Sequence, residues 1–173
     1  MEAQVRQRIS ASIELFRLPR YEEIPDVGLY LEQTSKYISD FTAPLQMPPI
    51  TGSMISNYVK KGLIASPVRK QYSREQIAQL IFIAAAKSVL SIDDLHLMIS
   101  IQRRTYPSEI AYDYFRKELC SALACVFGGT DALPPVGEDA TDQKVMLRNM
   151  IIALAHKVYL DKLFALLRAE ENI

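Results

Sequence analysis

The stretch that decides the fold covers residues 50–83 and reads "ITGSMISNYVKKGLIASPVRKQYSREQIAQLIFI". Thr51 is a candidate N-cap for a short helix over residues 51–61, because its hydroxyl can accept a hydrogen bond from the first turn. Gly62 follows two lysines at the position where a helix commonly ends in a left-handed residue. Ser73 opens the motif "SREQ", which has the spacing of a capping box and predicts a second, strongly apolar helix. The stretch therefore predicts two helices joined by a proline-bounded basic turn.

Charge is segregated along the chain although it cancels overall. The chain has 173 residues with 20 basic and 20 acidic side chains, so no net field directs it to nucleic acid, membranes or acidic substrates. Residues 51–76 nevertheless carry five basic side chains against one acidic side chain, whereas residues 21–40 carry one against five. A local excess of about four positive charges is what binding to a phosphate backbone requires.

Apolar residues recur at helical spacing through most of the remaining chain. The further helices predicted in this way cover residues 3–18, 29–41, a segment that starts at Ile92, 108–127 and 141–170. The intervening segment 130–139 is predicted as a loop, and the turn at 68–72 is the one candidate for strand structure. We predict an all-α protein: residues 1–104 form a winged helix-turn-helix domain with an N-terminal helix, and residues 105–173 form a C-terminal extension of two long helices.

The longest predicted helix, over residues 141–170, is apolar on more than one face. Such a helix needs cover on several sides, either from its own chain or from a second copy. We therefore expect a homodimer that pairs through the C-terminal helices.

The sequence also predicts the compartment and the redox state. Its longest purely apolar run, residues 80–86, is too short to span a bilayer, and no signal-peptide pattern opens the chain. We expect a cytoplasmic protein with no membrane partner. Cys120 and Cys125 lie five residues apart on a predicted helix, so they point about 140° away from each other and are expected to stay reduced.

No residue set in the sequence predicts catalysis. It contains no phosphate-binding loop, no nucleophile with a local base, and no His, Cys, Asp or Glu set at metal-ligand spacing. We expect no enzyme activity, no cofactor and no metal, and the sequence names no effector. One aromatic group has two readings, as the lining of a ligand pocket or as core or dimer packing, and its helical spacing favours packing. Its members are Tyr106, Tyr112, Tyr114 and Phe115.

The helix over residues 51–61 presents small polar side chains on the side that its apolar residues do not use. Such groups can approach base edges, and asparagine can pair bidentately with adenine, while lysines at the helix end reach phosphates. The basic turn beside it would place cations on the adjacent backbone or minor groove. The residues predicted to form the DNA-binding surface are Thr51, Ser53, Ser56, Asn57, Tyr58, Lys60, Lys61, Arg69, Lys70, Tyr72 and Arg74.

The segment "ITGSMISNYVKKGLIASPVRKQYSREQIAQLIFIAAAKSVLSIDDLHLMI" resembles the DNA-binding domain of the mercury-resistance (MerR) type regulators. The resemblance rests on the capping Thr51, the pair Asn57 and Tyr58, the turn "GLI", the wing proline and Tyr72, and the turn "SIDDL" after the next helix. With "LPRYEEIPDVGLYLEQ" upstream, the chain is also similar to a bacterial family found largely in Firmicutes, domain-of-unknown-function family 1836.

The resemblance to MerR-type regulators implies a transcription regulator that reads duplex DNA. In a dimer of this type, two recognition helices would lie about 34 Å apart on one face of the duplex. The alternative is a non-enzymatic helical adaptor that uses a degenerate winged-helix domain for protein contacts. Ser56 stands where these regulators commonly have arginine, and the wing is several residues shorter, which favours the adaptor.

Overall fold

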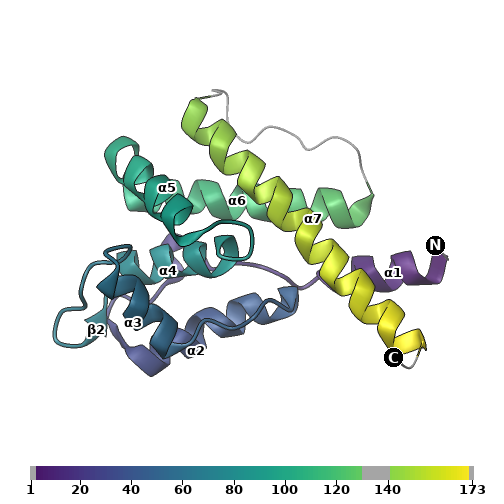
Figure 1. Ribbon diagram of the computed structural model, residues 1–173, viewed down its shortest axis with the longest axis horizontal. Coiled ribbons are helices and arrows are strands. Elements are labelled where there is room, and N and C mark those ends of the chain that lie inside the picture. Colours follow the sequence, from purple (N-terminus) through teal and green to yellow (C-terminus); the bar gives the residue numbers. More distant parts are fainter. Residues whose placement is uncertain (1–2, 130–140, 172–173) are drawn as a thin grey trace.

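The computed structural model describes residues 3–129 and 141–171, so the predicted loop at 130–139 lies outside the described residues. Within the described part, seven α-helices, two short 3-10 helices and two two-residue strands follow one another (Figure 1). The helices are α1 (Ala3–Ala11), α2 (Leu31–Thr42), α3 (Gly52–Lys60), α4 (Arg74–Ala86), α5 (Ile92–Thr105), α6 (Ser108–Gly128) and α7 (Asp142–Glu171). The 3-10 helices are η1 (Tyr21–Glu23) and η2 (Ala43–Leu45), and the strands are β1 (Leu29–Tyr30) and β2 (Gln71–Tyr72).

Helix α4 forms the centre of the molecule. Its sequence is apolar nearly all round, and most of its residues are buried. The predicted capping box is confirmed: Ser73 Oγ accepts a hydrogen bond from the Gln76 amide at 3.4 Å, and Gln76 Oε1 accepts one from the Ser73 amide at 2.9 Å. The helix packs against α2 on one side and against α6 and α7 on the other. It therefore joins the two halves of the chain through a common core.

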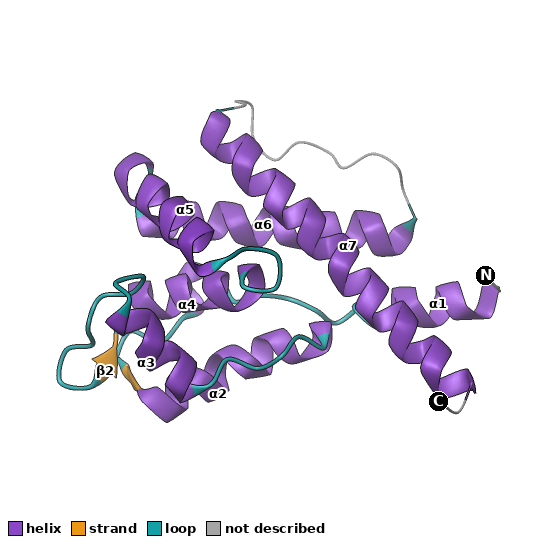
Figure 2. Ribbon diagram, viewed as in Figure 1, coloured by secondary structure: helices purple, strands orange, loops and turns teal. Residues whose placement is uncertain are grey.

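A small antiparallel sheet ties β1 to β2, with Leu29 opposite Tyr72 and Tyr30 opposite Gln71 (Figure 2). The prediction of a helix over residues 29–41 was therefore wrong at its start. Helix α2 begins two residues later, because Tyr30 donates its amide to Gln33 Oε1 at 2.9 Å and stays extended. The strand candidate at 68–72 is confirmed at its second half.

The first helix is shorter than the sequence predicts. It ends at Ala11 rather than continuing to residue 18, because Ser12 disrupts the regular hydrogen-bond pattern. The Ser12 amide is shared between the carbonyls of Arg8 and Ile9, and its hydroxyl donates to the Ile9 carbonyl at 2.6 Å. Short side-chain bonds of this kind compete with helical hydrogen bonds. Helix α1 packs against α6 and α7, at the end of the molecule opposite α3 (Figure 1).

Helix α7 crosses α6, and the two helices pack against each other (Figure 1). The middle of α7 is buried through Met150, Ile151, Leu154, Ala155 and Val158, whereas its last turns expose large apolar side chains. Tyr112 of α6 is also buried, and its hydroxyl donates to the Pro19 carbonyl at 2.9 Å. Burial raises the pKa of this phenol well above its usual range.

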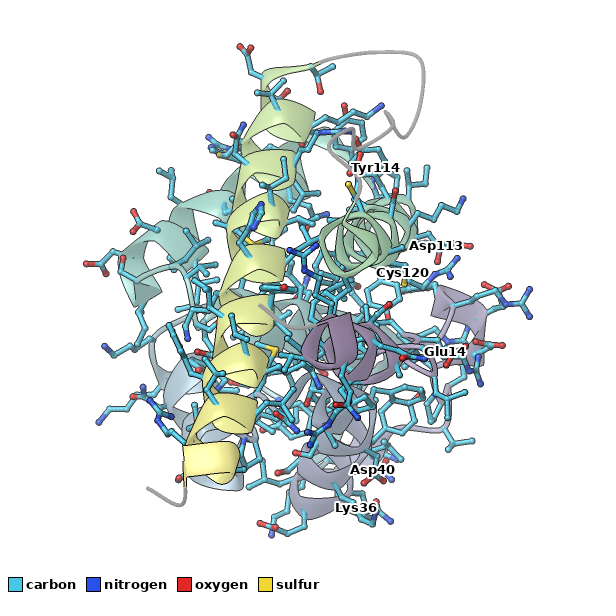
Figure 3. The ribbon with its side chains drawn as sticks, turned by 90° about the vertical axis from the view of Figure 1, so that its right-hand side faces the viewer. Glu14, Lys36, Asp40, Asp113, Tyr114 and Cys120 are labelled. Carbon is cyan, nitrogen blue, oxygen red and sulfur yellow. The ribbon has the colours of Figure 1, made fainter. Side chains whose placement is uncertain are left out.

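A buried ion pair links α6 to α7. Glu118 is fully buried, and its Oε1 accepts hydrogen bonds from Arg148 Nη1 and from the Tyr114 hydroxyl, each at 3.1 Å. Glu118 Oε2 is also buried and has no hydrogen-bond partner among the described residues. Figure 3 labels Tyr114 on α6.

Among the described residues no disulfide links Cys120 and Cys125, and both side chains are partly buried. In the same ranges, no group of three or more His, Cys, Asp or Glu side chains gathers into a possible metal site. None of the helices between residues 3 and 129 or 141 and 171 combines the length and the apolar character needed to cross a membrane.

Replacement of two glycines by alanine, one at a time, tests whether the turn after α3 requires a left-handed residue at position 62. Gly62 has a φ of +75°, so Gly62→Ala is expected to lower the free energy of unfolding by about 1 kcal/mol through backbone strain alone, since nothing lies within 4 Å of the added methyl group. Gly128 is helical and equally open, so Gly128→Ala serves as the control and is expected to be neutral or stabilising by up to about 1 kcal/mol. Urea denaturation measures both. Equal effects would contradict the assignment of the left-handed cap.

Candidate nucleic-acid interface

Helix α3 has one packed face and one exposed polar face. Ile55 and Tyr58 are buried at 0% and 4% exposure, and the helix packs mainly against α2. The opposite side carries exposed polar residues at spacings of 3, 1 and 3, which place them on a single stripe of the helix. These are Ser53, Ser56, Asn57 and Lys60. The sequence-based division of this helix into a packing side and a polar side is thus confirmed.

Both ends of α3 are capped by residues that the sequence identifies. Thr51 Oγ1 accepts a hydrogen bond from the Met54 amide at 3.2 Å. At the other end, the Leu63 amide donates to the Tyr58 carbonyl and the Gly62 amide to the Val59 carbonyl, each at 3.0 Å. This pair of bonds is a Schellman motif, which stops the helix sharply and leaves the two lysines at its carboxyl end.

The connection that leads into α3 is held by side chains that the sequence analysis missed. Ser35 of α2 donates to the Ile50 carbonyl at 2.6 Å, and Lys87 Nζ donates to the Pro48 carbonyl at 3.0 Å. Partial burial lowers the pKa of Lys87. Both contacts join residues that are far apart in the sequence, so no local pattern could have identified them.

The wing is a tight hairpin whose tip consists of two basic residues. The Gln71 amide donates to the Val68 carbonyl at 2.9 Å, and these two residues pair as an antiparallel bridge. Between them, Arg69 and Lys70 have φ values of +51° and +65°. Positive φ at both central positions is typical of a type I′ turn, which normally uses Asn and Gly. Each basic residue therefore carries backbone strain of about 1 kcal/mol. Both side chains are exposed.

Three of the predicted surface residues are held within the protein. Tyr58 and Tyr72 are each only 4% exposed, and burial raises the pKa of both phenols. Arg74 Nε donates to the Ile24 carbonyl at 2.9 Å, and its guanidinium carbon lies 5.8 Å from the centroid of the Tyr21 ring. These side chains stabilise the wing and the segment before β1, so the surface itself consists of the other eight residues.

The cations of this surface stand apart from the nearby acids. In the part of the chain that the structure describes, Lys60, Lys61, Arg69 and Lys70 are exposed and make no ion pair. The acidic side chains at 22 and 23 instead pair with arginines at 17 and 20. The basic charge is therefore available to an external partner.

The amino end of α3 is already occupied by a carboxylate. Glu32 Oε1 lies so close to Gly52 that a methyl group there would approach it to 2.9 Å. A negative charge at this position is stabilised by the helix dipole. A phosphate would be repelled here, so its binding must rely on the lysines at the carboxyl end of α3 and on the wing. Helix α2 also carries an exposed ion pair, in which Lys36 Nζ lies 2.6 Å from Asp40 Oδ2 (Figure 3).

Arg103 is a further residue that sequence reasoning did not find. Its Nη2 donates to the Leu63 carbonyl at 2.9 Å and to Gln79 Oε1 at 3.1 Å. It thereby connects the carboxyl ends of α3 and α5 with the middle of α4. This role depends on a tertiary contact over 40 residues of sequence.

A family model described as "Domain of unknown function (DUF1836)" matches residues 19–115. The matched span includes α2, α3, the wing, α4, α5 and the first turns of α6. No curated protein and no solved structure matches the chain.

Proposed function

Since the chain belongs to the DUF1836 family, whose description gives no activity, we propose from its geometry that it is a transcription regulator of MerR-like type. In this proposal, α3 enters the major groove of duplex DNA and the wing contacts the adjacent backbone. The carrying observation is that the polar face of α3, its two terminal lysines and the two cations of the wing are all exposed and free of ion pairs within the described residues.

The dimensions of α3 suit a major groove. Its nine residues span about 13 Å at about 1.5 Å per residue, and a B-DNA major groove is about 12 Å wide. Asn57 and Ser56 at the centre of the stripe would meet base edges, while Lys60 and Lys61 would contact phosphates. Strand β2, which follows the wing tip, and helix α3 lie at the same end of the molecule in Figure 1. One duplex can therefore meet both elements.

The test of this function is fluorescence-anisotropy binding to a random-sequence duplex pool over a salt series, with single-stranded DNA as the control. Four phosphate contacts predict that a plot of log affinity against log salt has a slope of about −3.6 or steeper, because each contact contributes about −0.9. A flat response on duplex, or equal slopes on duplex and single strands, would overturn the proposal. Protein pull-downs would then test the alternative adaptor function.

The wing tip offers a variant whose two effects have opposite signs. Arg69→Asn combined with Lys70→Gly is expected to raise the free energy of unfolding by about 1–2 kcal/mol, because Asn-Gly relieves the strain of the type I′ turn. The same variant should bind duplex DNA about 30-fold more weakly, since it loses two cations. Urea denaturation and anisotropy measure the two effects. Tighter DNA binding by the more stable variant would contradict the role of the wing.

We further propose that two copies pair through the last turns of α7. Leu160, Phe164 and Leu167 recur at spacings of 4 and 3 along one side of the helix, with exposed fractions of 46%, 47% and 37%. Burying such a stripe against its own copy removes apolar surface from water. Light scattering on the full chain is expected to give the mass of a dimer, and a monomer at high concentration would exclude this pairing.

A further inference from the structure

A cavity of about 180 Å³ lies where α4, α5, α6 and the first turns of α7 meet. It is walled largely by apolar side chains that include Phe82, Met98, Tyr106, Phe115, Met146 and Leu147. For comparison, an engineered apolar cavity of about 150 Å³ stays dry and binds benzene. All four residues of the aromatic group in the sequence analysis line this cavity, and two of them, Tyr112 and Phe115, are also buried in the core.

The aromatic walls have the geometry that receives a further ring. Phe82 and Phe115 meet edge to face, with ring centroids 5.2 Å apart and an interplanar angle of 84°. Edge-to-face and offset arrangements with a bound ring are favourable, and Met98 and Met146 add thioether groups that adapt to aromatic surfaces. A flat ring is therefore the occupant that matches these walls.

One polar group in the lining can fix the orientation of a ligand. Gln102 Nε2 donates to the Tyr106 carbonyl at 2.9 Å, which holds the carboxamide in place, and no described residue donates to its Oε1. Held in this way, Oε1 is an acceptor for an N–H or O–H group on the occupant. The described residues that line the cavity include no carboxylate, and their one lysine, Lys144, lies with Nζ 5.1 Å from the centroid of the Tyr114 ring.

We propose that this cavity binds a small uncharged aromatic molecule of one or two rings that carries a single hydrogen-bond donor. The cavity also contacts the DNA-binding half of the chain. Gln79 lines it and accepts from Arg103, which in turn donates to the Leu63 carbonyl directly after α3. A ligand in the cavity can therefore influence the carboxyl end of α3 through these two hydrogen bonds. An effect of the ligand on DNA binding rests on the proposed function, whereas binding itself does not.

The probe for this site is indole, and the chain is well suited to it because it contains no tryptophan. Indole fluorescence, excited on the red side of tyrosine absorption, is expected to shift to the blue and saturate with a Kd on the order of 0.1–1 mM, given about nine non-hydrogen atoms. 1-Methylindole lacks the N–H donor and should bind about tenfold more weakly. Indole-3-carboxylate carries a charge and should not compete.

Two substitutions in the cavity lining and one control outside it test whether indole binds in this cavity. Ala111 lines the cavity from α6, so Ala111→Phe should fill it and abolish the fluorescence shift without lowering the melting temperature. Ala153→Phe, at an exposed position of α7 outside the lining, is the matched control and should bind as the wild type does. Gln102→Leu should remove the preference for indole over 1-methylindole.

Three results would overturn the proposal: no saturable shift with wild-type protein, undiminished binding by a folded Ala111→Phe variant, or tighter binding of the carboxylate. If Ala111→Phe fails to fold, the Gln102→Leu comparison still decides. Because these measurements contain no DNA, their failure is distinct from a failure of the DNA-binding proposal. Conversely, indole binding with a flat DNA salt response would support a ligand-binding protein of another kind.

Discussion

Simultaneous replacement of Lys60, Lys61, Arg69 and Lys70 by alanine is expected to weaken binding to duplex DNA about 1,000-fold at low salt. The salt slope should fall towards zero in the same variant. The reason is that these exposed cations supply the phosphate contacts, which dominate affinity but carry no sequence information. The fold should survive, because the four side chains are solvent-exposed and make no ion pair in the described part of the chain.

The matched control removes the same charge from other surfaces. Arg6, Lys117, Lys157 and Arg168 are exposed basic residues on α1, α6 and α7, and their joint replacement by alanine makes an equal change in net charge. If binding depends on the surface of α3 and the wing, this control should lose less than about fivefold, from the change in net charge alone. Equal losses in the two variants would show that the attraction is a property of overall charge.

Arg148→Ala is expected to lower the free energy of unfolding by about 3 kcal/mol or more. The substitution leaves Glu118, which is 0% exposed, as a buried carboxylate without its cation. The Tyr114 hydroxyl still donates to Oε1, but even in the intact pair Oε2 has no hydrogen-bond partner in the described part of the chain. A buried charge that loses its counter-ion pays a desolvation cost that no remaining contact offsets.

Lys157→Ala provides the comparison for this prediction. Lys157 and Asp161 form an exposed ion pair on the same helix, with Lys157 Nζ 2.7 Å from Asp161 Oδ2. Such pairs contribute about 0.5 kcal/mol to the free energy of unfolding. The double variant Arg148→Met with Glu118→Leu should recover most of the stability, because it removes both charges and keeps the volume. Urea denaturation measures all three. Similar costs for Arg148→Ala and Lys157→Ala would contradict the importance of burial.

Several features of the candidate site depend only on residues that are close together in the sequence. The caps of α3 at Thr51 and Gly62 and the capping box at Ser73 were predicted, because each depends on residues within a few positions. The division of α3 into polar and apolar faces was predicted for the same reason, since helical spacing alone fixes which side chains share a face. Tyr58, Tyr72 and Arg74 also belong to this stretch, but their contacts with distant segments draw them into the protein.

The strand pairing was not predictable in the same way. The helix predicted over residues 29–41 includes Leu29 and Tyr30, whereas pairing with the wing makes these two residues extended. The positive φ values of Arg69 and Lys70 also escaped prediction, because neither residue prefers that conformation and the turn is imposed by the strands on either side. The cavity has the same origin, since four helices must pack before their shared lining exists.

The sequence by itself determined the helical architecture, the caps and the concentration of positive charge in residues 51–76, because hydrogen bonds within a turn and side-chain periodicity are local properties. The tertiary structure alone decided which cations remain free for a partner, which aromatic rings enclose a cavity and which carboxylate is buried between α6 and α7. These features depend on contacts between residues dozens of positions apart. Such contacts arise only when the helices bury their apolar faces against one another.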